Sequence, residues 1–222
     1  MQRLLGLILN RRNAGNSDRR LVILSVDGKH DVRARGTQKL ESKLAGSLEP
    51  LTLVDLTVVH GRSGEQVTGS SIRDSYRLIH GNLGRIAAAG VVAACADQLI
   101  HGLLDDPRPF RVVRETFLLI GRSRTNREVL LAVGFGLWNL LDNLGYRPGP
   151  DRFASVPAVR RLVAVYGRGN PNLVRRIRCS VRTARAAVDL ALAAVTDATD
   201  RAVPAATFFR SVVTTRRAAK RR

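Results

Sequence analysis

The spacing of apolar residues in this chain changes once, near Tyr76, from a period of two to a period of about 3.6. Before that point, short apolar runs alternate with turn residues, at residues 2–12, 19–26, 29–35, 51–59 and 65–72. Beyond it, apolar residues recur at helical spacing over residues 81–104, 110–120 and 127–144 and from residue 170 onward. The pattern predicts an α+β chain in which a five-stranded barrel precedes an all-helical domain.

The second and third runs are typical of a hairpin, because Asp27-Gly28 between them tolerates the positive φ that a tight turn requires. Beyond the turn, one face carries Val32 and Ala34 and the other carries Lys29, Asp31, Arg33 and Arg35. A half-buried strand with a basic outer face is therefore expected. Strand spacing alone allows either an OB-fold or an SH3-like barrel.

The predicted domains are residues 1–76 for the barrel, 77–215 for the helices and 216–222 for a basic tail. Asp105-Asp106-Pro107 is expected to end the first long helix. The longest helix is expected to start at Asn170-Pro171 and to run past Leu192, because apolar residues step by three or four along it.

The chain is strongly basic, with a formal charge of +19, of which residues 1–80 contribute +5 and residues 81–222 contribute +14. Such a chain attracts polyanions, and nucleic acid is the commonest of them. A membrane-binding protein is the competing class, but no apolar run reaches the roughly 18 residues of a spanning helix. The amino-terminal apolar run is also too short for a signal peptide. We expect a soluble cytoplasmic protein associated with the nucleoid.

Several short motifs recur in one known family. Gly15, Ser17, Asp18 and Arg19 open the second strand, a basic segment follows the third strand, and Leu144-Gly145-Tyr146-Arg147-Pro148 comes much later. Through these motifs the sequence resembles the RecO family of recombination mediators. The resemblance implies an amino-terminal OB-fold that binds single- and double-stranded DNA and anneals complementary strands. It also implies help in loading recombinase onto DNA coated with single-stranded DNA-binding protein, with the carboxy-terminal tail of that protein and a RecR-like protein as partners.

The chain departs from the family pattern where zinc-binding cysteines would follow residue 148, since Phe153 stands about where the first would fall. Cys95 and Cys179 are solitary, and neither a disulfide nor a zinc motif can be read from them. The four histidines are interpreted as ordinary surface or capping residues; they are His30, His60, His80 and His101. We therefore predict no metal and no other cofactor.

The predicted DNA-binding residues are basic side chains of the barrel region: Arg11, Arg12, Arg19, Lys29, Arg33, Arg35, Lys39 and Lys43. Residues 1–73 contain no Phe, Tyr or Trp, so base stacking on the barrel must be weak. Binding that follows the phosphate backbone and tolerates both single strands and duplex is expected.

Secondary DNA-binding residues are predicted on the expected long helix: Arg175, Arg176, Arg178, Arg182 and Arg185. Arg111 and Arg114, interleaved with apolar residues, are predicted to bind the partner's acidic tail. No phosphate-binding loop, zinc-protease helix or nucleophile elbow occurs in the sequence, so no enzymatic activity is predicted. A general RNA-binding OB-fold protein and a basic protein-protein scaffold remain as alternatives.

Overall fold

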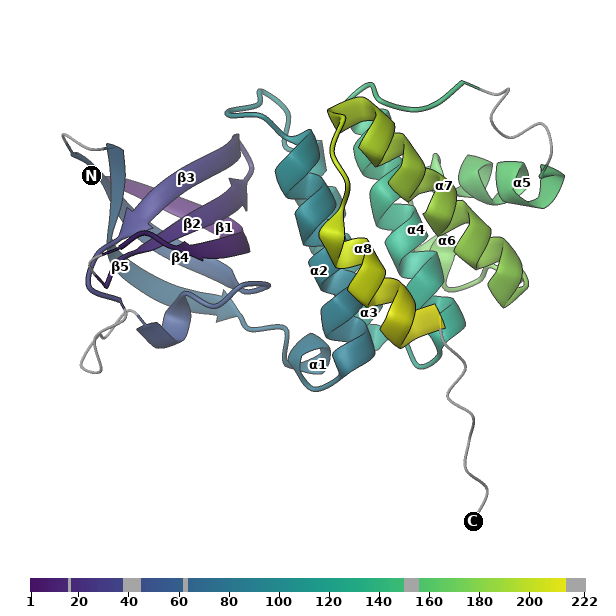
Figure 1. Cartoon of the computed structure of the whole chain (residues 1–222), viewed down its shortest axis with the longest axis horizontal. Coiled ribbons are helices and arrows are strands. Elements are labelled where there is room, and N and C mark those ends of the chain that lie inside the picture. Colours follow the sequence, from purple (N-terminus) through teal and green to yellow (C-terminus); the bar gives the residue numbers. More distant parts are fainter. Residues whose placement is uncertain (16, 38–44, 62–63, 150–155, 215–222) are drawn as a thin grey trace, which may run out of the picture.

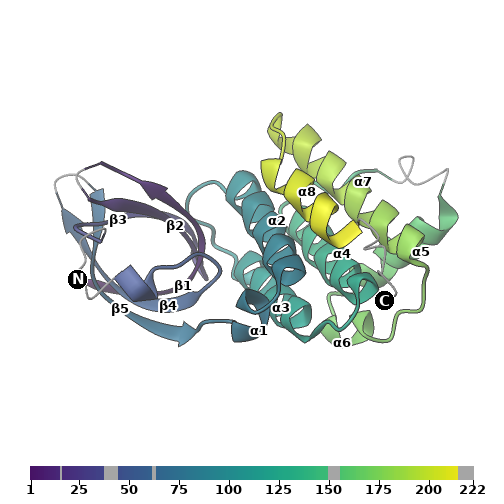
Figure 2. The ribbon, with the colours of Figure 1, turned by 60° about the horizontal axis from the view of Figure 1, so that its bottom comes forward.

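Five strands close into a barrel at the amino end of the chain (Figures 1 and 2). The structure, a computed structural model, describes residues 1–15, 17–37, 45–61, 64–149 and 156–214. The strands are β1 (Gln2–Asn13), β2 (Arg19–Ser25), β3 (Gly28–Ala34), β4 (Leu53–Gly61) and β5 (Gly64–Asp74). Their order is β1-β2-β3-β5-β4, with β4 pairing back to β1. This is the strand order of an OB-fold, so the predicted fold class is confirmed and the SH3-like alternative is not.

Alternate residues of the strands fill the barrel with aliphatic side chains. Ile8, Ile23 and Leu56 are fully buried there, and Val32 and Ala34 of β3 join them, as the alternation predicted. A 3-10 turn, η1 (Ala45–Ser47), lies between β3 and β4. Because the interior is packed with side chains, only the outer surface of the barrel is available to a large ligand.

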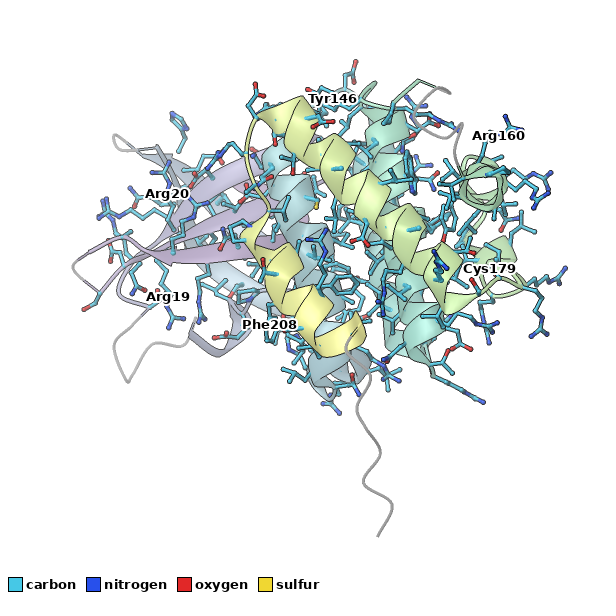
Figure 3. The ribbon with its side chains drawn as sticks, turned by 45° about the vertical axis from the view of Figure 1, so that its right-hand side comes forward. Arg19, Arg20, Tyr146, Arg160, Cys179 and Phe208 are labelled. Atoms are coloured by element: carbon cyan, nitrogen blue, oxygen red, sulfur yellow. The ribbon has the colours of Figure 1, made fainter. Side chains whose placement is uncertain are left out.

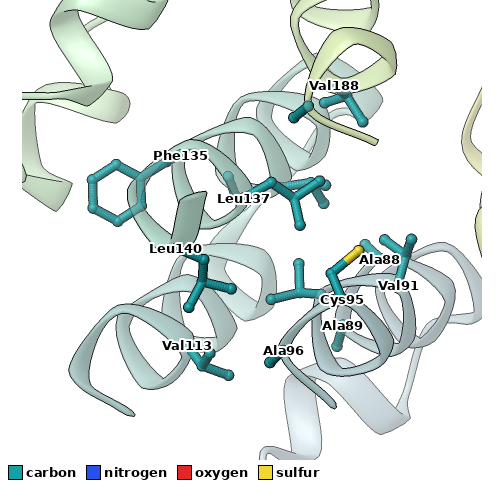
Figure 4. Packing of buried hydrophobic residues seen from close by; sticks show 14 of the residues in the cluster. Ala88, Ala89, Val91, Cys95, Ala96, Val113, Phe135, Leu137, Leu140 and Val188 are labelled. Carbon is teal, nitrogen blue, oxygen red and sulfur yellow. The ribbon is translucent and has the colours of Figure 1, made fainter. Parts of the chain in front are cut away.

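Helices form the rest of the described chain, beside the barrel in Figure 1. They are α1 (Arg77–His80), α2 (Leu83–Leu99), α3 (Arg108–Arg122), α4 (Asn126–Asn143), α5 (Pro157–Tyr166), α6 (Pro171–Val174), α7 (Val181–Thr199) and α8 (Pro204–Phe209), followed by a π-helical turn, η3 (Arg210–Thr214). Helix α4 lies at the centre, and every residue from 129 to 141 is buried. Figure 4 shows Leu137 and Leu140 of α4 within the shared core, near Val113 of α3 and Cys95 of α2.

The barrel and the helices share one apolar core. Leu7, Val22 and Leu24 project from the outer face of the barrel and are buried in the same cluster as Val92 and Ala96 of α2. Area removed from water contributes roughly 25 cal/mol per Å², so this contact holds the two parts together.

The segment after α2 adds a second contact with the barrel. Helix α2 ends at Leu99, earlier than the predicted stop at residues 105–107. The chain then runs beside the β2–β3 turn: the Gly102 carbonyl accepts from the Lys29 amide at 2.8 Å, and the Leu104 amide donates to the Asp27 carbonyl at 2.8 Å. Residues 102–104 therefore form backbone hydrogen bonds with the β2–β3 hairpin instead of continuing helix α2.

The single long helix predicted from residue 170 is wrong. Pro171 starts the short α6, capped by the Asn170 side chain, and this helix ends at Val174. Helix α7 begins only after Ser180, whose hydroxyl accepts from the Thr183 amide. Asn and Ser compete for backbone hydrogen bonds and favour helix starts, which the apolar spacing does not register.

Candidate nucleic-acid interface

Three arginines stand in one row across the outer face of β1, β2 and β3. Arg12 pairs with Arg20 in the β1–β2 ladder, and Arg20 pairs with Arg33 in the β2–β3 ladder. Directly opposed side chains share one face of a sheet. Val22 and Leu24 share this face on β2 but are covered by the helices. The arginine row is therefore a part of the face that the helices leave open.

A β-bulge in β1 brings Arg12 into this row. The register with β2 shifts by one residue at Leu9, directly after Ile8, which points into the barrel. One extra residue exchanges the inner and outer positions of everything that follows it. Without the bulge, Arg11 would lie on the outer face in place of Arg12.

Two carboxylates hold the arginine row in position. The Arg20 Nε donates to Asp31 Oδ1 at 2.5 Å, and the Arg33 Nε donates to Asp18 Oδ2 at 2.8 Å. The second Asp18 oxygen accepts from the Gly36 amide at 2.8 Å. The Gly36 hydrogen bond and, to a smaller extent, Arg33 lower the pKa of Asp18 against the opposing effect of burial. Both guanidinium groups are thereby oriented while Arg20 stays 63% exposed.

A polar groove of about 410 Å³ opens beside the row. Its walls come from the β1–β2 turn, the outer face of β2 and β3, and the start of β5; they are Asn13, Ala14, Arg20, Asp31, Arg33, Gly64 and Glu65. In OB-folds the face of the second and third strands, with the loops beside it, is where oligonucleotides bind. The groove and the arginine row together form the barrel face, the term used below for these residues.

The other predicted barrel residues lie elsewhere. Arg11 and Arg19 both approach Glu49, and their side chains are mostly buried. Arg35 is exposed just beyond β3. Lys39 and Lys43 lie outside the described residues.

Lys29 lies at the contact with α2. Its Nζ donates to the Asp97 backbone carbonyl at 2.5 Å and to Asp97 Oδ1 at 3.2 Å, and its side chain is 19% exposed. Asp97 Oδ2 also lies 3.5 Å from Arg12 Nη2 and accepts from the side-chain Nδ2 of Asn10 at 3.4 Å. Lys29 is thus part of the junction between barrel and helices.

Comparison with known protein families identifies the barrel region of this chain. The family described as "Recombination protein O N terminal" matches residues 1–76, the whole of the barrel. The protein named "DNA repair protein RecO" from Roseiflexus sp. (strain RS-1) is 35% identical over 153 residues, covering 69% of this chain and 53% of that protein. The chain belongs to the RecO family.

Two further RecO relatives give the same result. The DNA repair protein RecO of Anaeromyxobacter sp. (strain K) is 35% identical over 103 residues, or 45% of this chain and 40% of the relative. The DNA repair protein RecO of Symbiobacterium thermophilum is 27% identical over 144 residues, which cover 64% of this chain and 56% of the relative. The chain spans about half the length of the RecO relatives it matches.

Arg20 is a barrel-face residue that the sequence analysis did not select. Its neighbours in sequence give no sign of its place between Arg12 and Arg33. Knowing which residues of β1 and β3 lie opposite each residue of β2 would have identified Arg20. The pairing of β1 with β2 depends on the bulge at Leu9, so it could not be read from the sequence.

The interpretation of His30 as a surface or capping residue is wrong. Its ring is buried at the end of the barrel, with Nε2 at 3.0 Å from Asp27 Oδ1 and Nδ1 at 3.5 Å from Glu65 Oε2. Phe153, which the sequence analysis placed about where the first zinc-binding cysteine would fall, lies outside the described residues. Within the part of the chain that the structure describes, no three His, Cys, Asp or Glu side chains gather as a metal site would require.

The predicted secondary residues of this RecO chain are spread over the α6–α7 region. Arg176 and Arg178 are exposed in the turn between the two helices, and Arg182 is exposed in the first turn of α7. Arg185 is half-buried, and Arg175 borders a hollow of about 230 Å³ between α3 and α4.

Arg111 and Arg114 are exposed on α3, where Val112, Val113 and Phe117 are buried. The amphipathic helix expected around them is present. Over the described ranges, no helix is both long and apolar enough to cross a membrane.

Proposed function

We propose that this chain binds DNA on the barrel face, with Arg12, Arg20 and Arg33 contacting the phosphate backbone. The row of three arginines across adjacent strands is the observation that carries the proposal. Adjacent strands lie about 4.8 Å apart, so the row extends over about 10 Å and can meet successive phosphates of one strand. Arginine is suited to this contact because its planar fork donates two hydrogen bonds to one phosphate.

The surroundings of the row favour phosphates over bases. Residues 1–73 hold no Phe, Tyr or Trp on which a base could stack, and the groove walls are polar. Asp18 and Asp31 orient Arg33 and Arg20 in the absence of a ligand, so little side-chain entropy is lost when phosphate binds. We propose that single strands and duplex both bind, with Arg35 extending the surface beyond β3.

At the level of the whole protein, we propose a recombination mediator acting on nucleoid DNA. Weak base contact and strong backbone contact leave the base edges free to pair, which is what annealing of complementary strands requires. Recombinase loading onto coated DNA, with a RecR-like partner, follows the same family proposal. The proposal involves binding rather than catalysis.

The test of DNA binding is the double variant Arg20→Gln/Arg33→Gln. Losing two phosphate contacts is expected to weaken binding of a single strand about tenfold and to reduce the slope of log affinity against log salt by about 1.4. Fluorescence anisotropy over a salt series measures both. The matched control is Arg3→Gln/Arg73→Gln, since these arginines lie on β1 and β5 far along the strands from the row.

Equal losses in the variant and the control would overturn the barrel face as the site. Repeating the series with RNA of the same sequence tests the RNA-binding alternative, which predicts tighter binding to RNA. A scaffold predicts that neither double variant changes the affinity for nucleic acid.

We further propose that the acidic tail of single-stranded DNA-binding protein binds beside α3. A hollow of about 440 Å³ lies between the end of β5, α1 and α3, and Leu118 and Gly121 line it. Tyr76 and Phe117 also line it, in edge contact with ring centroids 5.4 Å apart. Positions 111, 114, 118 and 121 follow one helix face. Exposed Arg111 and Arg114 therefore continue this apolar wall with positive charge, which suits an acidic peptide that also carries apolar residues.

Arg111→Glu/Arg114→Glu is expected to weaken binding of that tail, as a labelled peptide, by about tenfold, because attraction is replaced by repulsion. Arg3→Glu/Arg201→Glu, on exposed residues of β1 and of the turn after α7, is the charge-matched control. Unchanged peptide affinity in the α3 variant, measured by anisotropy at one salt concentration, would contradict the assignment.

A further inference from the structure

The end of the molecule farthest from the barrel carries a dense set of arginines. Residues 156–188 contain eight arginines and no Asp or Glu. Seven of these are exposed. The exposed Arg175 borders the hollow between α3 and α4, and the other six define the helical-end surface: Arg160, Arg161, Arg168, Arg176, Arg178 and Arg182. Helix α5 packs against α7, which brings their arginines to one end. Figure 3 shows Arg160 and Cys179 at this end and Arg20 at the other.

Across the ranges that the structure describes, these six arginines lack the carboxylate partners that several barrel arginines have. Arg20, Arg33 and Arg11 are each paired with an Asp or Glu. Among the residues that the structure describes, none of the six on the helical-end surface makes an ion pair. Uncompensated charges of one sign raise the local potential and concentrate anions. Folding alone does not account for this arrangement, since exposed like charges repel one another.

Nucleic acid is the polyanion that this surface fits best. The charge is carried entirely by arginine, whose guanidinium forks match phosphate oxygens. It is spread over α5, the turns that follow α5 and α6, and the start of α7, rather than gathered in one pocket. An extended backbone of regularly spaced phosphates can contact such a surface along its length.

We propose that the helical-end surface is a second, independent site for a nucleic-acid backbone, so that one molecule holds two strands at opposite ends. Figure 1 places α5 and α6 at the end of the long axis opposite the barrel. A short strand on the barrel face therefore leaves the helical-end surface free for another. The claim that one molecule holds two strands rests on the proposed function of the barrel face. The claim that the helical-end surface binds nucleic acid does not. Two strands on one molecule raise the effective concentration of one for the other, which favours their annealing.

The experiment is native mass spectrometry of the full chain with a single-stranded oligonucleotide of about 12 nucleotides, short enough to occupy one site. The unmodified chain is expected to form a complex of one protein with two oligonucleotides. Arg178→Glu/Arg182→Glu is expected to weaken the second binding step about tenfold and to lower its salt slope by about 1.4. Arg182→Glu places a negative charge in the first turn of α7, where such a charge is favourable, so the variant is expected to fold.

The control is Arg77→Glu/Arg201→Glu, which makes the same charge change on exposed residues outside both surfaces. A complex limited to one oligonucleotide in the unmodified chain, or two retained by the Arg178/Arg182 variant, would overturn the second site. So would binding of anionic phosphatidylserine vesicles through these arginines without binding of the oligonucleotide. Failure of the barrel face appears separately, as full binding by Arg20→Gln/Arg33→Gln, and leaves the helical-end result standing.

Discussion

A Gly28→Val variant is expected to unfold with a free energy about 3–4 kcal/mol lower than the unmodified chain. Gly28 has a φ of +114°, which side chains with a Cβ rarely adopt. A Cβ at this position would also lie 2.5 Å from the Leu104 nitrogen, 2.6 Å from the Gly102 oxygen and 2.7 Å from the Leu103 Cα. These are backbone atoms, so the segment must move away from the hairpin and give up its two hydrogen bonds to Asp27 and Lys29.

Gly64→Val separates the two causes of this loss. Gly64 has a φ of +96°, but no atom lies within 4 Å of where its Cβ would stand. It therefore carries the backbone strain alone, about 1–2 kcal/mol. Urea unfolding followed by circular dichroism gives both values. If the two variants lost the same free energy, the contact between residues 102–104 and the hairpin would be shown to contribute nothing.

The barrel could be predicted because its determinants are local. Period-two alternation sets which face of β3 is buried, and Asp27-Gly28 sets where β2 turns into β3, so Val32 and Ala34 were placed correctly. Turn residues and alternation act within a few positions of each other in sequence. The strand order could not be predicted from such local features, because β1 pairs with β4, which lies about 50 residues later in the sequence.

The arginine row could be predicted only in part because it depends on register. Alternation put Arg33 on the outer face, but Arg12 reaches that face through a bulge at Leu9 that no turn residue marks. Arg20 acquires its role from the residues opposite it, on strands to either side. The sequence shows which residues are basic, but the pairing of the strands determines which of these residues lie next to one another.

Contacts between distant segments explain the remaining differences. Lys29 alternates with buried residues as a solvent-facing cation would, yet its side chain is covered by α2, where its partner Asp97 lies 68 positions away in sequence. The break between α6 and α7 arises from Asn170 and Ser180, whose side chains cap two separate helices while the apolar spacing continues across both. In each case the local pattern is correct and a competing interaction decides the outcome.

Asp97→Ala is expected to lower the free energy of unfolding by about 2 kcal/mol, because it leaves Lys29 with a single acceptor in the junction. The two side chains are only 19% and 18% exposed, so water replaces the lost carboxylate poorly. The Asp97 backbone carbonyl still accepts from Lys29 Nζ, which keeps the loss below that of a fully buried pair. Asn10 and Arg12 lose a weaker partner at the same time.

A double-mutant cycle with Lys29→Met isolates the pair. The coupling free energy between Asp97 and Lys29 is expected to be about 1–2 kcal/mol, against less than about 1 kcal/mol for the more exposed pair of Arg73 and Asp55.

The same Lys29→Met variant also tests where DNA binds. If Lys29 acts only at the junction, its loss changes the affinity for a single strand by less than about twofold, whereas a phosphate contact would lower the salt slope by about 0.7. A lowered slope with no coupling to Asp97 would return Lys29 to the DNA-binding surface and remove it from the junction.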